Sequence, residues 1–398
     1  MSNIYIDRKV SGVIRYSCAF LFVAFSLTYL YFMQGDLLSE AQFVYSHGLT
    51  SYSIPIGAVV ITVVLQIIQK VQVNILRFNW QYYALSYFPS LFLLGLLTGI
   101  THDDLPDFHW GCWSWLIPIA FVLYFVLVYL QKDKKMMIDS VSELLWRNYI
   151  ILFAFILMCG AIPRTNEVHQ YEFSVERHIV QKDYEGALNV AQQSLLSTRR
   201  LTELRMYALA RKGLLAECLF DYPQYYMGEG LLSVSDSDSI YRYPPLKICV
   251  WLGAVPDGVK VRTTYQYLWA LNAVDSLRTQ RTQDYFLCYL LLQKKLKEFQ
   301  KELVRFYPDS ICPRLPRAYS EAVVYINNVY GENLQYAIDP KIIDRFRLYE
   351  QRKESIQNET ERNNLLRREF GNTFWWYYEL SKSATTKQLP PMKTKSSS

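Results

Sequence analysis

The sequence lacks the short motifs that mark common catalytic and nucleotide-binding sites. It contains no G-x-S-x-G, no G-x-x-x-x-G-K-[ST], no G-x-G-x-x-G and no H-E-x-x-H. Its seven cysteines include no C-x-x-C pair, and no two of its five histidines have H-x-x-x-H spacing. A zinc ribbon and a dithiol redox site are therefore disfavoured, and no cofactor is indicated.

The chain after residue 165 lacks any apolar run long enough to cross a bilayer, whereas the chain before it contains five. A bilayer core requires about 20 mostly apolar residues of helix. The candidate spans are 13–33, 54–69, 83–100, 112–130 and 146–162. The first is too long for a signal-peptide core and lacks a small-x-small cleavage site. The pattern predicts an all-α protein that begins with a five-helix transmembrane bundle over residues 1–165.

Two of the loops between the spans, 34–53 and 101–111, lack Lys and Arg altogether. Basic residues lie instead before the first span, between spans two and three, and between spans four and five. Short loops rich in Lys and Arg remain in the cytoplasm. The N-terminus is therefore expected inside and the C-terminal half outside, although Arg164 breaks the alternation once. In a bacterium this topology corresponds to the inner membrane with a periplasmic domain.

The spans also lack internal Asp and Glu, so proton- or ion-coupled transport has little support. Aromatic residues cluster near the span ends, as expected of side chains in the interfaces of a lipid bilayer. Trp80, Trp110, Trp113 and Trp146 are examples. An aromatic cage for a substrate is the less favoured interpretation of the same residues.

Residues 166–381 lack strand-like alternation and follow a helical period. Helices are expected over 175–180, 184–196, 201–219, 265–277, 285–306, 317–330, 340–353 and 361–380. A long irregular segment, 221–260, separates the early helices from the later ones, and long loops are often functional. The polar end, 382–398, is expected to be disordered.

The stretch from Lys182 to Leu188 resembles the turn and second-helix start of a tetratricopeptide (TPR) repeat. Two later stretches, 207–223 and 289–308, each end in Tyr-Pro, where proline prevents the helix from continuing. A TPR-like helical-repeat domain is predicted over 166–381, and an ordinary helical domain is the alternative. Stacked repeat helices would offer a groove for another protein.

The whole layout resembles an uncharacterised bacterial family of membrane proteins that have N-terminal spans and a periplasmic, TPR-like helical tail. The likeness is carried by 181–196, by the Leu-Pro-Arg-Ala-Tyr-Ser-Glu-Ala stretch at 315–322 and by the aromatic stretch 370–378. It implies no activity and no site residues. The aromatic stretch is interpreted as a helix packed on its own domain, with contact to lipid headgroups as the alternative.

Dense basic stripes are absent from the chain. The 42 Lys and Arg exceed the 36 Asp and Glu only slightly, and the two signs are interleaved. This is typical of solvated helix faces, so nucleic acid is not an expected partner. Four cysteines lie in the outer half: Cys218, Cys249, Cys288 and Cys312. One disulfide is conceivable in an oxidising compartment, but free thiols are favoured.

One group of residues could carry chemistry. The second outer loop contains His102, Asp103, Asp104, Asp107 and His109. Imidazoles and carboxylates can bind zinc or transfer protons, so these five are weak catalytic candidates, and the two histidines are weak metal-ligand candidates. Polar loop residues in water are the favoured interpretation.

Two functions from different classes remain. The first is a membrane-anchored scaffold that binds a partner protein of the cell envelope with its helical-repeat domain. Its candidate partner-binding residues are Tyr207, Arg211, Tyr289 and Lys294. The alternative is an envelope enzyme or accessory that acts on lipid-linked glycans through the outer-loop Asp/His set. The sequence does not fix the oligomeric state.

Overall fold

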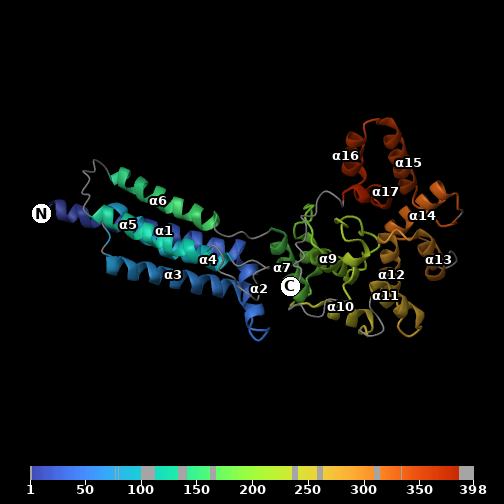
Figure 1. Ribbon diagram of the computed structural model, residues 1–398, viewed down its shortest axis with the longest axis horizontal. Coiled ribbons are helices and arrows are strands. Elements are labelled where there is room, and N and C mark those ends of the chain that lie inside the picture. The colour runs from blue at the N-terminus through green and yellow to red at the C-terminus, as the bar shows by residue number, and fades with distance from the viewer. Residues whose placement is uncertain are drawn as a thin grey trace. The chain divides into compact units, whose positions relative to one another are not determined.

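A computed structural model of the chain describes residues 2–76, 78, 80–99, 113–132, 141–161, 167–234, 241–257, 263–308, 314–332 and 334–384. Within these ranges every regular element is a helix and no strand occurs, which confirms the all-α class. The chain divides into two compact units, Met1–Phe173 and Ser174–Ser398. Figure 1 labels the helices of both units.

Three described helices of the first unit are long and apolar enough to cross a membrane. The first is α1 (Ser2–Thr28), which continues through the π-helix η1 (Tyr29–Met33). The others are α3 (Ile54–Leu76) and α6 (Val141–Ala161). Their apolar spans, Val10–Met33, Ile54–Leu76 and Val141–Gly160, match predicted spans one, two and five.

Predicted spans three and four correspond to shorter apolar helices, Tyr82–Thr98 and Ile117–Leu130. Span three consists of the 3-10 helix η2 (Trp80–Tyr87), kinked at Tyr82, followed by α4 (Phe88–Thr98). Span four lies in α5 (Trp113–Lys132), which contains Pro118. The loop predicted at 34–53 contains a helix, α2 (Gly35–Tyr45), that its polar composition did not indicate. A bundle of five full-length spans is therefore not established.

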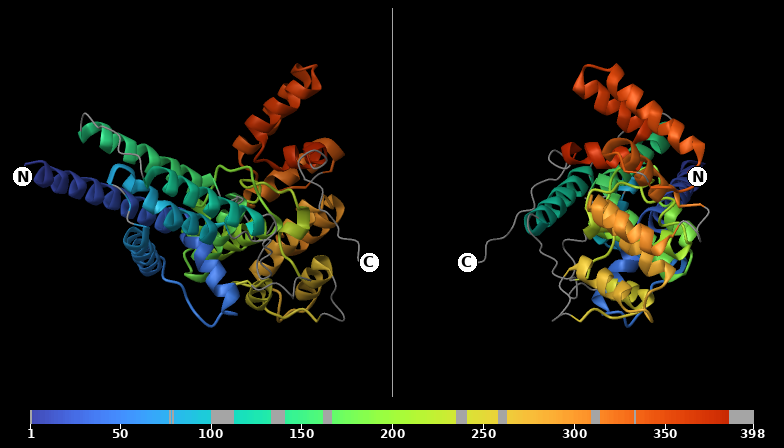
Figure 2. Two further views of the ribbon diagram at one scale, coloured as in Figure 1. Left: turned by 60° about the vertical axis from the view of Figure 1, so that its left-hand side comes forward. Right: turned by 90° about the vertical axis from the view of Figure 1, so that its right-hand side faces the viewer.

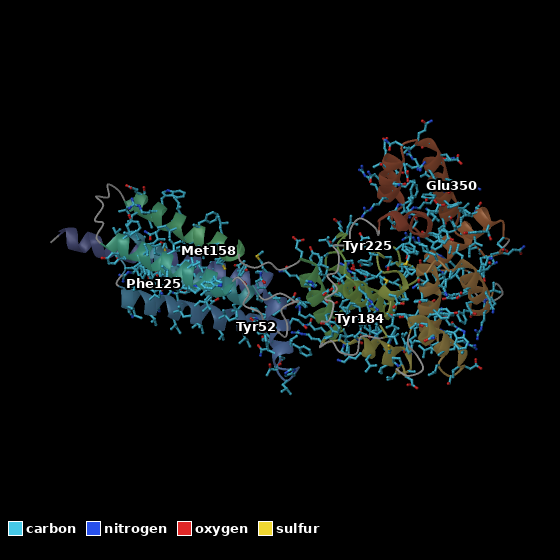
Figure 3. The ribbon with its side chains drawn as sticks, in the orientation of Figure 1. Tyr52, Phe125, Met158, Tyr184, Tyr225 and Glu350 are labelled. Carbon is cyan, nitrogen blue, oxygen red and sulfur yellow. The ribbon has the colours of Figure 1, made fainter. Side chains whose placement is uncertain are left out.

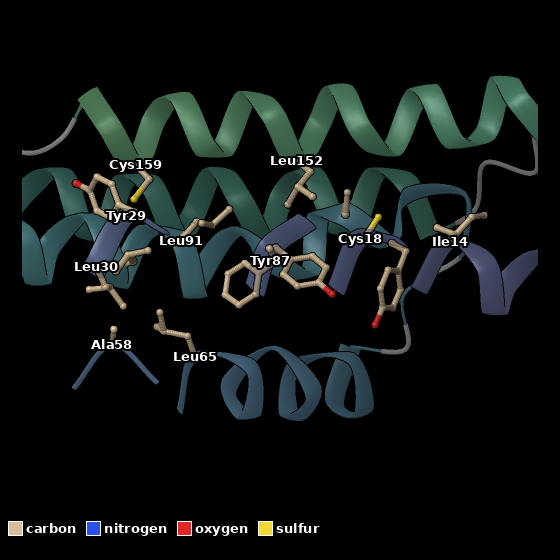
Figure 4. Close-up of a cluster of buried hydrophobic side chains, with 14 of the residues drawn as sticks. Ile14, Cys18, Tyr29, Leu30, Ala58, Leu65, Tyr87, Leu91, Leu152 and Cys159 are labelled. Carbon is tan, nitrogen blue, oxygen red and sulfur yellow. The ribbon is translucent and has the colours of Figure 1, made fainter. Parts of the chain in front are cut away.

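Helix α3 shows why the first unit is suited to lipid. Its inward positions follow a helical period and are buried: Ala58, Thr62, Leu65 and Gln69. Its other faces carry apolar side chains that are about half exposed, including Val59, Val63 and Ile67. A helix in water would place polar residues there. Helix α4 has almost no exposed face, and its Leu91 joins the buried cluster that Figure 4 shows with residues of α1, α3 and α6.

Polar contacts connect these helices inside the first unit. Gln69 of α3 donates Nε2 to the Tyr83 hydroxyl at 3.0 Å and to Ser86 Oγ at 2.8 Å. Asn148 of α6 accepts the Ala84 amide at 2.9 Å. This contact joins α6 to η2 and lets a side chain of a neighbouring helix satisfy a buried backbone donor.

The second unit is built of short helices that pack against their sequence neighbours. In chain order they are α7 (Glu167–Val180, which begins in the first unit), α8 (Tyr184–Asn189), α9 (Arg199–Arg211), η4 (Met227–Gly230), α10 (Pro245–Leu252), α11 (Thr264–Ala273), α12 (Gln280–Leu292), α13 (Leu296–Phe306), α14 (Arg317–Tyr330), α15 (Pro340–Ser355), α16 (Glu359–Phe370) and α17 (Phe374–Ala384). The α15–α16 hairpin projects from the rest of the unit (Figure 2).

Three turns between these helices share one geometry. Lys182, Gly213 and Lys294 each adopt a positive φ, of 60°, 71° and 59°, directly after a helix. At each turn the following amide donates back into the helix, as Asp183 N to His178 O, Leu214 N to Leu209 O and Lys295 N to Leu290 O. This is the Schellman cap, which ends a helix and lets the chain fold back. The repeated feature is thus a Schellman-capped helix end, which is followed by α8 and α13 after Lys182 and Lys294 and by an irregular segment after Gly213.

Several predicted helices are wrong in length, two of them because of a Schellman cap at Gly213 or Lys294. The helix expected over 184–196 ends at Asn189, and the one expected over 201–219 ends at Arg211. The expected 285–306 helix is divided at Lys294 into α12 and α13. The helix expected over 317–330 is α14, with the same ends. The end predicted to be disordered from 382 is still helical to Ala384, and 385–398 lie outside the described residues.

Candidate functional site

The second unit contains a cavity of about 460 Å³, here called the arginine cavity. This volume lies in the range of small-molecule and peptide-residue pockets. One wall comes from the segment after α9 and the other from α15, α16 and α17. The lining residues are Leu195, Phe220, Asp221, Tyr222, Pro223, Gln224, Tyr225, Met227, Arg345, Arg367, Arg368, Glu369, Gly371, Asn372, Trp376 and Tyr377.

The first wall is held by contacts on both sides of it. The Schellman cap at Gly213 turns the chain, and Ala318 N then donates to Ala216 O at 3.0 Å. Tyr222 donates its hydroxyl to Leu188 O at 2.9 Å, which joins the wall to the end of α8. The segment 220–227 is therefore fixed although it is irregular. Tyr225, labelled in Figure 3, belongs to this wall.

The second wall is held together by one carboxylate of α17. Glu379 accepts the hydroxyls of Tyr325 at 3.1 Å and Tyr349 at 2.7 Å, and it pairs with Lys353 at 2.9 Å. These three partners come from α14 and α15. The turn between α16 and α17 is equally close, because a Cβ at Gly371 would lie 2.4 Å from Arg367 O. The position requires glycine, and it brings the arginines of α16 next to the aromatic residues of α17.

More positive than negative charge remains unpaired in the arginine cavity and is available to a ligand. Its two carboxylates already face arginines outside the lining: Asp221 pairs with Arg317 at 3.1 Å, and Glu369 lies 3.6 Å from Arg352. The guanidinium groups of Arg367 and Arg368 form no ion pair or hydrogen bond with any residue in the described ranges. The cavity thus combines two unpaired cations with aromatic walls.

Arg345 is the third cation of the lining. It donates Nη2 to Asn372 Oδ1 at 2.7 Å and to the Glu369 carbonyl at 3.3 Å, neither of which is charged. Burial and the neighbouring Arg317 hold the pKa of Arg345 below its usual value. An anion placed beside Arg345 would relieve both effects.

Two polar atoms of the lining residues have no hydrogen-bond partner among the described residues: Gln224 Oε1 and Trp376 Nε1. Gln224 is only 8 % exposed, and its Nε2 already donates to Leu219 O at 2.7 Å. Buried polar atoms without partners are uncommon and costly. Both atoms are themselves buried, so they add no hydrogen-bonding group to the surface of the cavity.

A smaller recess of about 220 Å³ adjoins the same polar network and shares Arg345 with the arginine cavity. Arg317 lies at its centre and pairs with Glu321 at 3.0 Å. The other Glu321 oxygen accepts the Phe374 amide at 2.7 Å and so caps the start of α17. The Glu321 side chain is buried, so this pair is structural: it joins α14 to the turn that carries Asn372.

A second cluster of reactive residue types lies between α12 and α14. Asp284 accepts the hydroxyls of Tyr307 at 2.6 Å and Tyr319 at 3.0 Å. Burial raises the pKa of Asp284, and it also raises that of nearby Cys288. A thiol with a raised pKa is a poor nucleophile. The cluster is best explained as a buried hydrogen-bond network and offers no catalytic pair.

The described cysteines of the second unit likewise offer no activated nucleophile. Cys218, Cys249 and Cys288 are free thiols, as favoured from the sequence, and Cys312 lies outside the described residues. Burial raises the pKa of Cys218 to about 11 and that of Cys249 to about 12. Within the described residues no group of His, Cys, Asp and Glu could hold a metal ion.

Of the four sequence-predicted partner-binding residues, two are in contact, because Arg211 donates Nη1 to the Tyr207 hydroxyl at 2.8 Å. Tyr289 and Lys294 lie in α12 and in the turn that follows it. Tyr207 is fully buried, and Tyr289 is buried against Gly228. Arg211 is exposed and stacks on Tyr184 at 4.8 Å. Lys294 donates Nζ to the Tyr378 carbonyl at 2.8 Å, and none of the four lines the arginine cavity. Their role in partner binding stays a prediction.

The predicted outer-loop set, His102, Asp103, Asp104, Asp107 and His109, lies outside the described residues. The arginines of the cavity, in turn, were interpreted from the sequence as part of a solvated helix face. The signal that could have distinguished them is their position, because Arg367 and Arg368 directly precede the aromatic stretch 370–378.

Residues 264–381 match a family of unknown function, DUF6057. No curated protein and no solved structure has significant similarity to the chain. The match extends from the start of α11 into α17 and so includes Arg345, Arg367, Arg368 and Trp376. The wall formed by 220–227 precedes it. The match assigns no activity to the arginine cavity, and the likeness to TPR repeats gains no support from it.

Proposed function

We propose that this chain is a membrane-anchored scaffold whose helical unit binds a partner protein through the arginine cavity. The single observation that carries the proposal is the cavity itself, a recess of about 460 Å³ with aromatic walls and cations that lack carboxylate partners. The side chains of Arg367 and Arg368 are at least partly exposed, so an anionic partner can reach them.

The membrane anchor in this proposal is a five-span bundle. The three long apolar helices support it, and Tyr82–Thr98 and Ile117–Leu130 would supply the other two crossings. The Lys and Arg pattern of the short loops supports a cytoplasmic N-terminus. The helical unit would then lie on the outer face of a bacterial inner membrane, in the periplasm, where it can meet other envelope proteins.

The helical unit suits a scaffold because its helices are turned by defined caps and its binding surface is shared between distant segments. The Schellman caps at Lys182 and Lys294 connect α7 to α8 and α12 to α13, and the cap at Gly213 ends α9. The cavity walls come from residues more than a hundred positions apart, such as Tyr225 and Arg367. The helical hairpins support a repeat-like scaffold, and the TPR-like assignment is part of this proposal.

In-cell photo-crosslinking tests the proposal. A photoreactive amino acid at Tyr225 should yield a discrete adduct with one envelope protein, and Arg367→Glu with Arg368→Glu should abolish it. The same amino acid at Trp269, which is exposed on α11 and outside the cavity lining, is the matched control. No adduct at Tyr225, or adducts of equal yield at both positions, would contradict a partner site in the cavity.

A further inference from the structure

The lining of the arginine cavity restricts the chemistry of its occupant. Its aromatic and apolar side chains include Phe220, Tyr225 and Trp376, which favour an apolar group. Its unpaired guanidinium groups favour an anion, and the planar guanidinium fork fits carboxylate and phosphate oxygens. The occupant should therefore combine apolar and anionic groups.

The positions of the three arginines favour a ligand with several separated carboxylates over a ligand with one compact anion. Arg345 lies on α15, whereas Arg367 and Arg368 are consecutive residues of α16. Consecutive residues on an α-helix point about 100° apart, since one turn contains 3.6 residues. The three arginines thus reach the cavity from different backbone positions on two helices. A phosphate needs donors that converge, but carboxylates spaced along a peptide match donors that are spread.

The negative lining residues favour the same occupant. Asp221 and Glu369 line the cavity together with the arginines and would repel a phosphate dianion more strongly than single carboxylates.

We infer that the arginine cavity binds an acidic segment of a partner polypeptide, in which carboxylates flank an apolar or aromatic side chain. This inference rests on the proposed function and specifies the partner's chemistry. Arg367 and Arg368 take the carboxylates, Arg345 supports them from α15, and the aromatic walls cover the apolar side chain.

A binding assay with a synthetic peptide tests the inference. The probe is a short peptide of alternating Glu, Phe, Asp and Leu with a neutral fluorophore, and its partner is the full chain in phosphatidylcholine nanodiscs. We expect saturable binding that weakens at least about tenfold when Gln and Asn replace the acids, and equally with Arg367→Glu plus Arg368→Glu. Arg368→Gln, at an exposed residue, should weaken binding in a chain that remains folded.

The matched control is Arg347→Glu plus Arg362→Glu. These residues lie on α15 and α16 and change the net charge equally, but they do not line the cavity. Binding should stay within about twofold of the parent chain, because screened distant charges contribute little. An equal loss in both double variants, or equal binding of the neutral peptide, would overturn the inference.

Two competitors separate the anion sources. Inorganic phosphate or phosphatidylglycerol vesicles that displace the probe more effectively than unlabelled acidic peptide would overturn the inference in favour of a phosphate ligand. Failure of peptide binding while the Tyr225 adduct persists would reject the acidic segment alone. Peptide binding without any cellular adduct would instead reject the scaffold function.

Discussion

Arg317 shows how one side chain can organise a site without lining it. Its guanidinium pairs with Asp221 and Glu321, at 3.1 and 3.0 Å, and also donates to the Asn372 carbonyl. It thereby joins the segment after α9, helix α14 and the turn before α17. These are the elements that bring the two walls of the arginine cavity together.

Replacing Arg317 by Met should destabilise the chain by about 3–5 kcal/mol, because the Glu321 carboxylate would remain buried without its counter-charge. Thermal melting of the full chain in detergent would detect this as a drop of roughly 6–20 °C in apparent midpoint. Adding Glu321→Gln to the same variant should recover part of the loss, since the buried charge is then removed. A single variant as stable as the parent chain would contradict the structural role of the pair.

The carboxyl group of Asp284 is expected to make the stability of the chain depend on pH. Burial raises the pKa of Asp284, against the hydrogen bonds that Tyr307 and Tyr319 donate to it. Because the native carboxyl keeps its proton to a higher pH than the unfolded one, its contribution to stability is complete below the unfolded pKa of about 4. That contribution is lost as the pH rises through the raised native pKa.

Asp284→Asn removes this titration. The parent chain's melting midpoint minus that of the variant should therefore fall as pH rises above about 4. Melting curves at a series of pH values measure the difference, and subtraction cancels the other carboxyl groups. A difference that rises with pH would show that the native pKa of Asp284 is lowered rather than raised.

The partner-binding role predicted for individual residues stays untested, but the structure shows where their side chains lie. Tyr207 and Tyr289 were chosen for their positions on helical stripes, but the fold buries both. Periodicity identifies a face but does not show whether another helix covers it. The sequence did not distinguish Arg367 and Arg368 from other charged residues. Only the three-dimensional structure shows that they lack ion-pair partners among the described residues.

At the scale of elements, hydrophobic periodicity mainly failed to predict the turns at which helices end. Apolar spacing continues through Lys212–Gly213 and through Lys294 without interruption, so single long helices were expected there. A Schellman cap depends on one residue with positive φ and on backbone hydrogen bonds, and neither alters hydrophobic spacing. The α14 helix was predicted with correct ends because Pro316 and Gly331 mark them in the sequence.

The cap residues predict opposite effects for two substitutions. Gly213→Ala should destabilise the chain by about 1–2 kcal/mol, because φ there is 71° and alanine avoids this region. No neighbouring atom lies within 4 Å of the added Cβ, so the cost comes from the backbone alone. Lys182→Gly, at a φ of 60°, should stabilise by up to about 1 kcal/mol.

Apparent melting midpoints should accordingly move in opposite directions for these two variants. Gly160→Ala is the matched control for Gly213→Ala, since Gly160 lies within α6, lacks a positive φ and has open space around its Cβ. It should leave the midpoint unchanged or slightly higher. A Gly213→Ala midpoint equal to that of the control would argue against the positive-φ cap.

At the scale of the whole molecule, the distribution of apolar residues predicted the all-α class and an apolar bundle near the N-terminus. The three long apolar helices agree with it. The η2–α4 segment was harder to predict because hydropathy does not register a 3-10 turn or the kink at Tyr82. The arginine cavity could not be predicted from the sequence, because its walls come from segments that only the tertiary fold brings together.

In the proposed topology, the apolar bundle holds the helical unit on the outer face of the membrane. Two C-terminal reporter fusions test this topology directly: alkaline phosphatase, which is active only outside the cytoplasm, and a fluorescent protein that matures only inside it. We expect an active phosphatase and a dark fluorescent fusion. A fluorescent fusion with an inactive phosphatase would place the helical unit in the cytoplasm and contradict this topology.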